Sequence, residues 1–177
     1  MREHPGIRAV LPQRYPMLLV DRILELDPRR SIRTVKAVTA TEPCYAGLPE
    51  DAEPWRYHYP PALLIESFGQ SAALLWLDGH APAADDGLTL MFVGATEFVF
   101  EGGVLPGDVL IHTVRLDNVI AGTAFASGET WAGTRRVARV TTLVATRRPV
   151  PHLTGPADAS AVAAGPGPAQ RSREGSR

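Results

Sequence analysis

The chain has 177 residues, of which 45% are hydrophobic, so it is long enough for one domain with a substantial core. Its 18 basic and 19 acidic side chains leave a net charge of −1, which gives no reason to expect nucleic acid or an anionic membrane as a partner. The single cysteine, Cys44, excludes an intrachain disulfide and argues against a cysteine-based metal site, and we predict no bound metal.

The first residues do not form the apolar core of a signal peptide, because Arg2, His4, Arg8 and Arg14 interrupt them. No apolar run in the chain approaches the ~20 residues that are needed to cross a bilayer. We therefore expect a soluble cytoplasmic protein with no membrane partner.

In chain order, the first clear element is an alternating segment at Ser31–Val38, which predicts a strand. A loop rich in Pro, Glu and Asp follows from Pro43 to Pro60. The segment Tyr59–Leu75, YPPALLIESFGQSAALL, then predicts an apolar helix that ends before Gly79. This helix carries an acid, Glu66, and an amide, Gln70, four residues later and therefore on the same face.

After the helix, the hydrophobic period changes from 3.6 to 2, which predicts strands. They are expected at Leu88–Val93, Glu97–Phe100, Val109–Val119, Thr123–Trp131 and Arg135–Thr146. Turn signals stand at 106–108 and at two hairpin tips, 121–122 and 132–133. The fold class is therefore α+β, with one long central helix wrapped by an antiparallel sheet over residues 1–150. Residues 151–177 are rich in Gly, Ala, Pro and Ser and predict a disordered tail.

Four segments, in this order, resemble the hotdog-fold 3-hydroxyacyl-ACP dehydratases of the FabZ and FabA type. They are LPQRYPMLLVDRILELDP, TEPCYAG, PPALLIESFGQSAALL and MFVGATEFVFEGGVLPGDVL. The resemblance implies a hotdog fold and a dimer with composite sites at its interface. It also implies a 3-hydroxyacyl substrate on the phosphopantetheine arm of an acyl carrier protein, and a dehydration that uses no metal or dissociable cofactor.

Glu66 matches the helical acid of this family, and Gln70 matches a glutamine four residues further on. In the family, a histidine handles most of the proton transfer, opposite an acid from the other subunit. A backbone N–H at the helix start binds the thioester carbonyl oxygen. By this resemblance, Glu66 is a predicted catalytic residue.

Two departures from the family pattern stand just before the helix. Leu48 occupies the place of the family histidine, and it cannot carry a proton. Pro61 occupies the place of the glycine that gives its N–H to the thioester, and proline has no N–H. The loop is also about four residues longer than is usual in the family. His58, in this loop, is the candidate replacement and the second predicted catalytic residue; the alternative is a surface or loop histidine without a catalytic role.

Four residues are predicted to contact the substrate: Gln70, Tyr57, Tyr59 and Ala62. Another histidine, His112, alternates with Leu110 and Val114 in a predicted strand, which favours a structural position in the sheet.

Three functions stay open at this stage. The first is an active dehydratase, in fatty-acid or, by preference, polyketide or polyene biosynthesis. The second is an incomplete subunit that supplies Glu66 to a heterodimer with a histidine-bearing relative. The third is a non-catalytic module that binds an acyl chain or an acyl carrier protein. A hotdog thioesterase is a weaker alternative.

Overall fold

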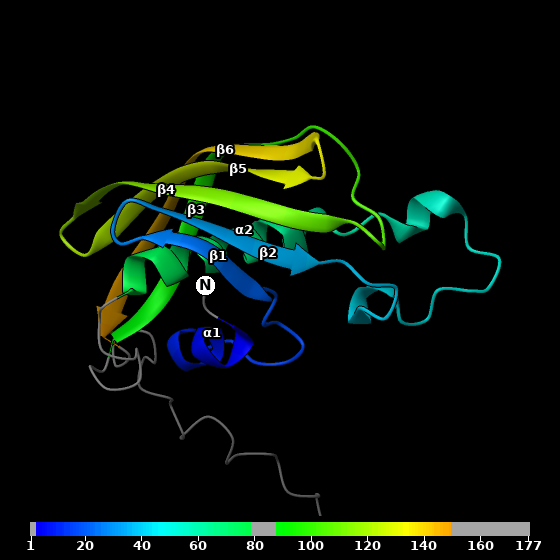
Figure 1. The fold of residues 1–177 in the computed structure, drawn as a ribbon, viewed down its shortest axis with the longest axis horizontal. Helices are drawn as coiled ribbons and strands as arrows, with labels where there is room; N and C mark the ends of the chain where they lie inside the picture. Colours follow the sequence, from blue (N-terminus) through cyan, green and yellow to red (C-terminus); the bar gives the residue numbers. More distant parts are fainter. Residues whose placement is uncertain (1–2, 79–87, 150–177) are drawn as a thin grey trace, which may run out of the picture.

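The computed structural model describes residues 3–78 and 88–149. Six antiparallel strands form one sheet in the order β1-β2-β4-β5-β6-β3, and the long helix α2 lies against it (Figure 1). The elements are α1 (His4–Val10), β1 (Arg22–Asp27), β2 (Ser31–Ala37), η1 (Pro43–Tyr45), η2 (Pro54–Tyr57), α2 (Pro61–Leu77), β3 (Leu88–Phe100), β4 (Val109–Ile120), β5 (Thr123–Ala132) and β6 (Arg135–Pro149).

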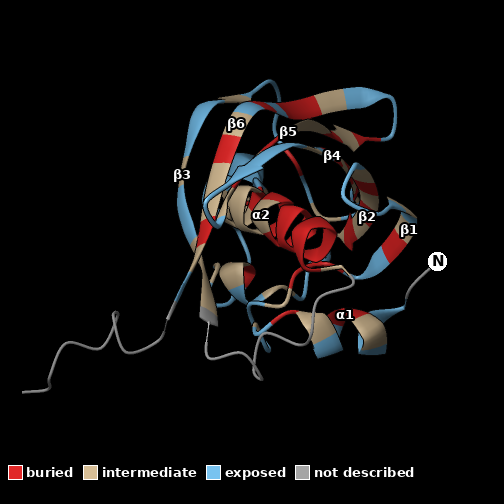
Figure 2. Ribbon diagram, turned by 90° about the vertical axis from the view of Figure 1, so that its left-hand side faces the viewer, coloured by how far each residue is buried: buried red, intermediate tan, exposed pale blue. Residues whose placement is uncertain are grey.

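The sheet curves around α2, so that the helix lies in its concave side and is buried along most of its length (Figure 2). This arrangement confirms the predicted α+β fold with a central helix. The predicted tail at 151–177 lies outside the described residues and stays a prediction. Within the described ranges, the longest helix falls short of what a membrane crossing requires.

Helix α2 begins at Pro61 and ends at Leu77, two residues later at each end than the sequence predicted. Pro60 is the N-cap and Pro61 is the first helical residue, where a missing N–H removes no helical hydrogen bond. Eleven of its residues are buried, because the helix is covered by the sheet on one side and by α1 on another.

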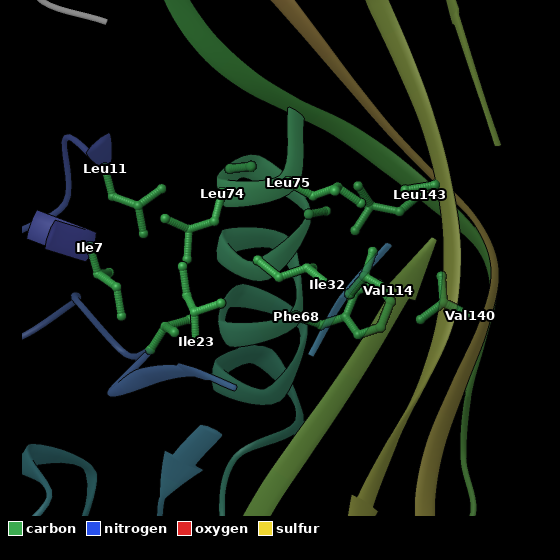
Figure 3. Packing of buried hydrophobic residues seen from close by; sticks show 14 residues of the cluster. Ile7, Leu11, Ile23, Ile32, Phe68, Leu74, Leu75, Val114, Val140 and Leu143 are labelled. Carbon is green, nitrogen blue, oxygen red and sulfur yellow. The ribbon is translucent and has the colours of Figure 1, made fainter. Parts of the chain in front are cut away.

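The N-terminal helix α1 was not predicted from the sequence. It has only seven residues, too few for a hydrophobic period to be recognised, and its one buried residue is Ile7. Ile7 and Leu11 face Leu74 of α2, while Phe68 and Leu75 face the sheet residues Val114, Val140 and Leu143 (Figure 3). Tertiary packing thus stabilises a helix that would be marginal alone.

The prediction of two separate strands at Leu88–Val93 and Glu97–Phe100 was wrong. They form the single strand β3, which pairs with β6 along its whole length. The register shifts between Phe92 and Gly94, and Glu97 has a positive φ of 51°. At these irregularities the alternation of the sequence is interrupted, which suggested two strands. The strand nevertheless continues, because it pairs with the 15-residue strand β6 on both sides of them.

The turns follow the residue types at their tips. Ala121 and Gly122 both have positive φ, as a two-residue hairpin turn requires, and they connect β4 to β5. At the turn before β4, the Asp108 N–H donates to the Leu105 carbonyl at 3.0 Å, with Gly107 at φ 100°. This is a turn with proline first and glycine second at its centre, as expected for type II.

His112 is fully buried between the sheet and α2. Its Nδ1 lies 2.8 Å from Thr130 Oγ1 and its ring meets the Phe68 ring edge-on, but Nε2 has no partner in the described structure. Burial, with Lys36 as a second cause, lowers the pKa of His112 from 6.5 to about 3. The predicted structural position is confirmed for this histidine, with only one of its two ring nitrogens bonded.

This buried imidazole predicts a specific acid sensitivity. The unfolded chain binds a proton below pH 6.5, but the folded chain does so only near pH 3, so stability is complete above 6.5 and falls below it. Between pH 6.5 and 4.5, wild type should lose about 2–3 kcal/mol more unfolding free energy than His112→Leu. Urea denaturation at several pH values measures this. Parallel pH curves for the two proteins would contradict it.

Candidate active site

Glu66 lies in the second turn of α2 and is half-buried. Its Oε1 accepts a hydrogen bond from Gln70 Nε2 at 2.8 Å and a longer one from Gln13 Nε2 at 3.4 Å. One carboxylate oxygen is thus held by two amides. No hydrogen bond within the described residues occupies the other oxygen, Oε2, which leaves it available for a ligand.

A small cavity of about 70 Å³ lies beside this carboxylate. Along α2 its wall includes Glu66, Gly69 and Ala73, spaced at i, i+3 and i+7 on one helix face, together with Ile65 and Gln70, and Gln13 adds a second amide. The opposite wall comes from β3 and β6 and is apolar: Leu90, Phe92, Leu143 and Ala145. The carboxylate and the two amides therefore face a wall that is suited to hydrocarbon.

Gln70 is 1% exposed and fixes the chain segment that precedes β1. Its Oε1 accepts from the Leu19 N–H at 2.9 Å, and its Nε2 donates to the Met17 carbonyl at 2.6 Å as well as to Glu66. The amide therefore has two functions at once, since it ties α2 to the segment Met17–Leu19 and orients the carboxylate. Sequence spacing predicted its contact with Glu66 but not the contacts with the loop.

Replacing Gln70 by leucine is expected to lower the free energy of unfolding by about 1–3 kcal/mol, because the N–H of the buried Leu19 would lose its acceptor and the Met17 carbonyl its donor. Urea denaturation measures the change. Gln13→Leu is the matched control, since its amide makes only the 3.4 Å contact, and it should cost less than ~1 kcal/mol. Equal losses in the two variants would contradict the bracing role of Gln70.

The loop between β2 and α2 projects from the body of the protein (Figure 1), and His58, as C-cap, ends the short helix η2 within it. An ion pair between Lys36 and Glu42 fixes the start of this loop, and a 2.7 Å bond from the Tyr59 N–H to the Val104 carbonyl fixes its end. The His58 side chain is exposed and packs against Gly103, where an added Cβ would lie 2.9 Å from Nε2. No side chain of the described residues holds this ring by a hydrogen bond.

The other predicted loop residues face inward. Tyr59 is 3% exposed and packs with Tyr45 and Leu64 in a second apolar cluster, against which Tyr57 and Leu48 also pack. Burial raises the pKa of Tyr59 far above its usual range, so its phenol stays protonated. Leu48, which the family resemblance predicts at the place of the histidine, thus packs against this apolar cluster.

At the helix start, Pro61 and Ala62 are both exposed. Pro61 has no N–H to offer, so the first N–H of α2 belongs to Ala62, and no backbone acceptor outside the helix is bonded to it in the described structure. It points out of the helix at the positive end of the helix dipole, as the first N–H groups of any helix do.

Sequence reasoning missed Gln13 and the apolar wall of the cavity. Gln13 belongs to the segment LPQRYP, far from Glu66 along the chain. One indication in the sequence linked Gln13 to the site, which is that LPQRYP begins the first of the four segments that resemble the family. For the wall residues from β3 and β6, the sequence pattern indicated only that they belong to alternating strands. Their convergence on Glu66 depends on sheet order, which periodicity does not give.

Comparison with known proteins places this chain among dehydratase relatives. The FabA-like domain family matches residues 11–141. A 3-hydroxyacyl-[acyl-carrier-protein] dehydratase FabZ from Burkholderia thailandensis is 41% identical over 116 residues, which cover 66% of this chain and 70% of the relative. A FabZ from Burkholderia mallei is 40% identical over 116 residues, covering 66% and 72%.

Solved structures confirm the predicted hotdog fold. The dehydratase heterocomplex ApeI:P from Xenorhabdus doucetiae aligns with a TM-score of 0.67 at 17% identity, covering 83% of this chain and 93% of the other. A hot-dog-like protein from Thermanaerovibrio acidaminovorans aligns with a TM-score of 0.55 at 16% identity, covering 72% and 87%. At these identities the likeness establishes the fold alone.

Proposed function

Since the chain belongs to the FabA-like domain family, we propose that it is a dehydratase-type subunit that acts on 3-hydroxyacyl thioesters of an acyl carrier protein. The observation that carries this proposal is the Glu66 carboxylate, oriented by Gln70 at the wall of an apolar cavity. The FabZ relatives, at 40–41% identity, support the substrate class.

The reaction needs two proton transfers and no redox step. The C2–H bond breaks and its electron pair becomes the C2=C3 double bond, while the C3–O bond breaks and the hydroxyl leaves with a proton as water. We assign the C2 proton to a histidine base and the protonation of the hydroxyl to Glu66. Afterwards the proton returns from imidazole to carboxyl through solvent. The phosphopantetheine arm of the carrier presents the substrate, and no dissociable cofactor takes part.

The geometry of β3 supports a dimer as the working unit. β3 is an edge strand of 13 residues whose outer side has no partner within the described chain (Figure 2). Phe92 is 51% exposed, Val93 61% and Phe100 41%. A long apolar edge of this kind invites pairing with another chain. A second hotdog subunit paired antiparallel along β3, about a two-fold axis, would cover it.

Such pairing would bring His58 towards Glu66 of the other subunit. The Glu66 cavity contains Leu90 and Phe92, from the first half of β3, whereas His58 packs on Gly103, just past its last residue. In an antiparallel two-fold pair, the first half of one strand faces the second half of the other. Each composite site would then combine Glu66 from one subunit with His58 from its partner.

The donor to the thioester carbonyl oxygen is then the Ala62 N–H. Pro61 cannot donate, and the next N–H of α2 is free of backbone partners outside the helix in the described structure. Charge that develops on the carbonyl oxygen is favoured at the N-terminus of a helix. Leu48 provides no imidazole and Pro61 provides no backbone N–H. In this proposal His58 supplies the imidazole and Ala62 supplies the N–H.

A heterodimer is the second candidate, in which a histidine-bearing relative replaces one copy of this chain. Two observations favour it: Leu48 is packed at the position that we align with the family histidine, and no hydrogen bond from the described residues orients the His58 ring. The ApeI:P structure is a heterocomplex of dehydratases. We also propose a specialised pathway, polyketide or polyene assembly, over general fatty-acid synthesis, because this chain lacks the usual family histidine at position 48.

Incubation of the purified protein with 3-hydroxybutyryl-carrier protein tests the proposal, with loss of water followed by mass spectrometry. Formation of the 2-enoyl thioester by the protein alone supports the homodimer. Turnover only after co-expression with a histidine-bearing hotdog relative supports the heterodimer. Binding of the acylated carrier without turnover in either format would overturn the dehydratase proposal in favour of a binding module.

A further inference from the structure

Gly69 stands in the middle of α2, three residues after Glu66 and four residues before Ala73. Glycine in the interior of a helix lowers helix stability relative to alanine, because it loses more backbone freedom on folding. A glycine here therefore needs a reason, such as an unusual backbone angle or a close neighbour.

Neither reason is present among the residues that the structure describes. Gly69 does not have a positive φ, and a Cβ built on it meets none of their atoms within 4 Å apart from the adjoining backbone of its own helix. Gly128 is the opposite case, since its Cβ would lie 2.1 Å from the Thr113 carbonyl oxygen. The packing of this chain requires glycine at 128 but leaves the space beside Gly69 open.

That open space belongs to the cavity beside the candidate catalytic carboxylate. Along the helix axis, Gly69 lies about 4.5 Å beyond Glu66, a distance of roughly three to four methylene groups. The cavity continues past it to Ala73, and Leu90 and Leu143 contribute to its other side. A chain whose reacting carbons lie at Glu66 and which runs along this wall would pass Gly69 near its sixth carbon.

We infer that Gly69 is a specificity-determining residue, whose missing side chain leaves room for the hydrocarbon of medium-length acyl groups. The inference rests on the proposed function, because that function places the reacting carbons at Glu66. Side chains at position 69 would narrow the cavity beyond the reacting carbons and leave short acyl groups unaffected. A filled cavity wall discriminates against the extra methylene groups of a longer ligand.

Gly69→Ala and Gly69→Val test this with saturated acyl-pantetheine thioesters, which have no 3-hydroxyl and cannot be dehydrated. Calorimetric titration compares butyryl with octanoyl. In Gly69→Val, the Kd for octanoyl-pantetheine is expected to rise about tenfold or more, with butyryl changed less than about threefold. Gly69→Ala should shift the same ratio less, while its Tm rises by about 2–4 °C, which shows that lost binding is not lost folding.

Unchanged selectivity between butyryl and octanoyl in both variants would overturn the inference. Equal weakening of both ligands, together with dissociation of the dimer in sedimentation experiments, would also overturn it, because position 69 would then face the partner subunit. If the proposed function is wrong, the wild-type protein will not convert 3-hydroxybutyryl thioesters. The binding of the saturated probes does not depend on turnover, so it tests the role of Gly69 separately.

Discussion

Replacing Glu66 by glutamine is expected to lower kcat for dehydration by about 10²–10⁴-fold, the usual contribution of a positioned acid or base. Glutamine has nearly the same shape, and its carbonyl oxygen can still accept from Gln70, as Glu66 Oε1 does at 2.8 Å. The fold should therefore survive while the exchangeable proton is lost. KM should change little, because the wall of the cavity is otherwise unaltered.

Steady-state kinetics with a 3-hydroxyacyl-carrier protein measures the effect. Glu25→Gln is the matched control, since Glu25 is exposed on β1 and pairs with Arg33, away from the cavity. It should keep wild-type turnover. If Glu66→Gln retained more than about a tenth of wild-type kcat, the carboxylate would be a structural group and not the acid of the reaction.

His58→Ala is expected to reduce kcat by a similar factor of about 10²–10⁴ in the homodimer, because Leu48 leaves no other histidine in this loop. Stability should not fall, because the side chain is exposed and no hydrogen bond in the described structure depends on it. Added imidazole should restore part of the activity, which a purely structural histidine would not allow.

His4→Ala is the control for this experiment, since His4 is exposed on α1, outside the loop that carries His58. Full activity of His58→Ala would remove the relocated histidine from the mechanism. Activity would then have to come from a partner with its own histidine, and the heterodimer would become the better account.

Much of the fold could be predicted from the sequence because its signals are local. The apolar stripe of α2 and its initial prolines place the helix to within two residues, and alternation places β2 and β4 to β6. Turn residues such as Ala121-Gly122 require particular φ values, so they identify a hairpin without tertiary information.

What could not be predicted depends on contacts between distant segments. The continuity of β3 is imposed by pairing with β6, and α1 exists because Ile7 packs on α2. At the site, spacing alone related Glu66 to Gln70. Gln70 also holds the backbone at Met17 and Leu19. These residues are 51 to 53 positions away in the sequence, so only the folded structure shows this contact.

The site departs from the family pattern at two positions, one in the loop before α2 and one at the helix start. Leu48 and Pro61 each lack a group that the family chemistry uses, and sequence comparison alone registers two losses. The structure places His58 beside Gly103, next to the free edge of β3, and leaves the Ala62 N–H at the helix start. The proposed function assigns the missing groups to these two residues, in a dimer in which a second subunit lies along β3.

Complementation between two inactive variants tests this composite site most directly. His58→Ala and Glu66→Gln subunits with different tags are co-expressed, and the heterodimer is purified by both tags. One of its two sites then combines His58 with Glu66, so turnover per dimer should return to about half of wild type, while each variant homodimer stays inactive. A heterodimer as inactive as the two homodimers would show that Glu66 does not work with His58 of its partner.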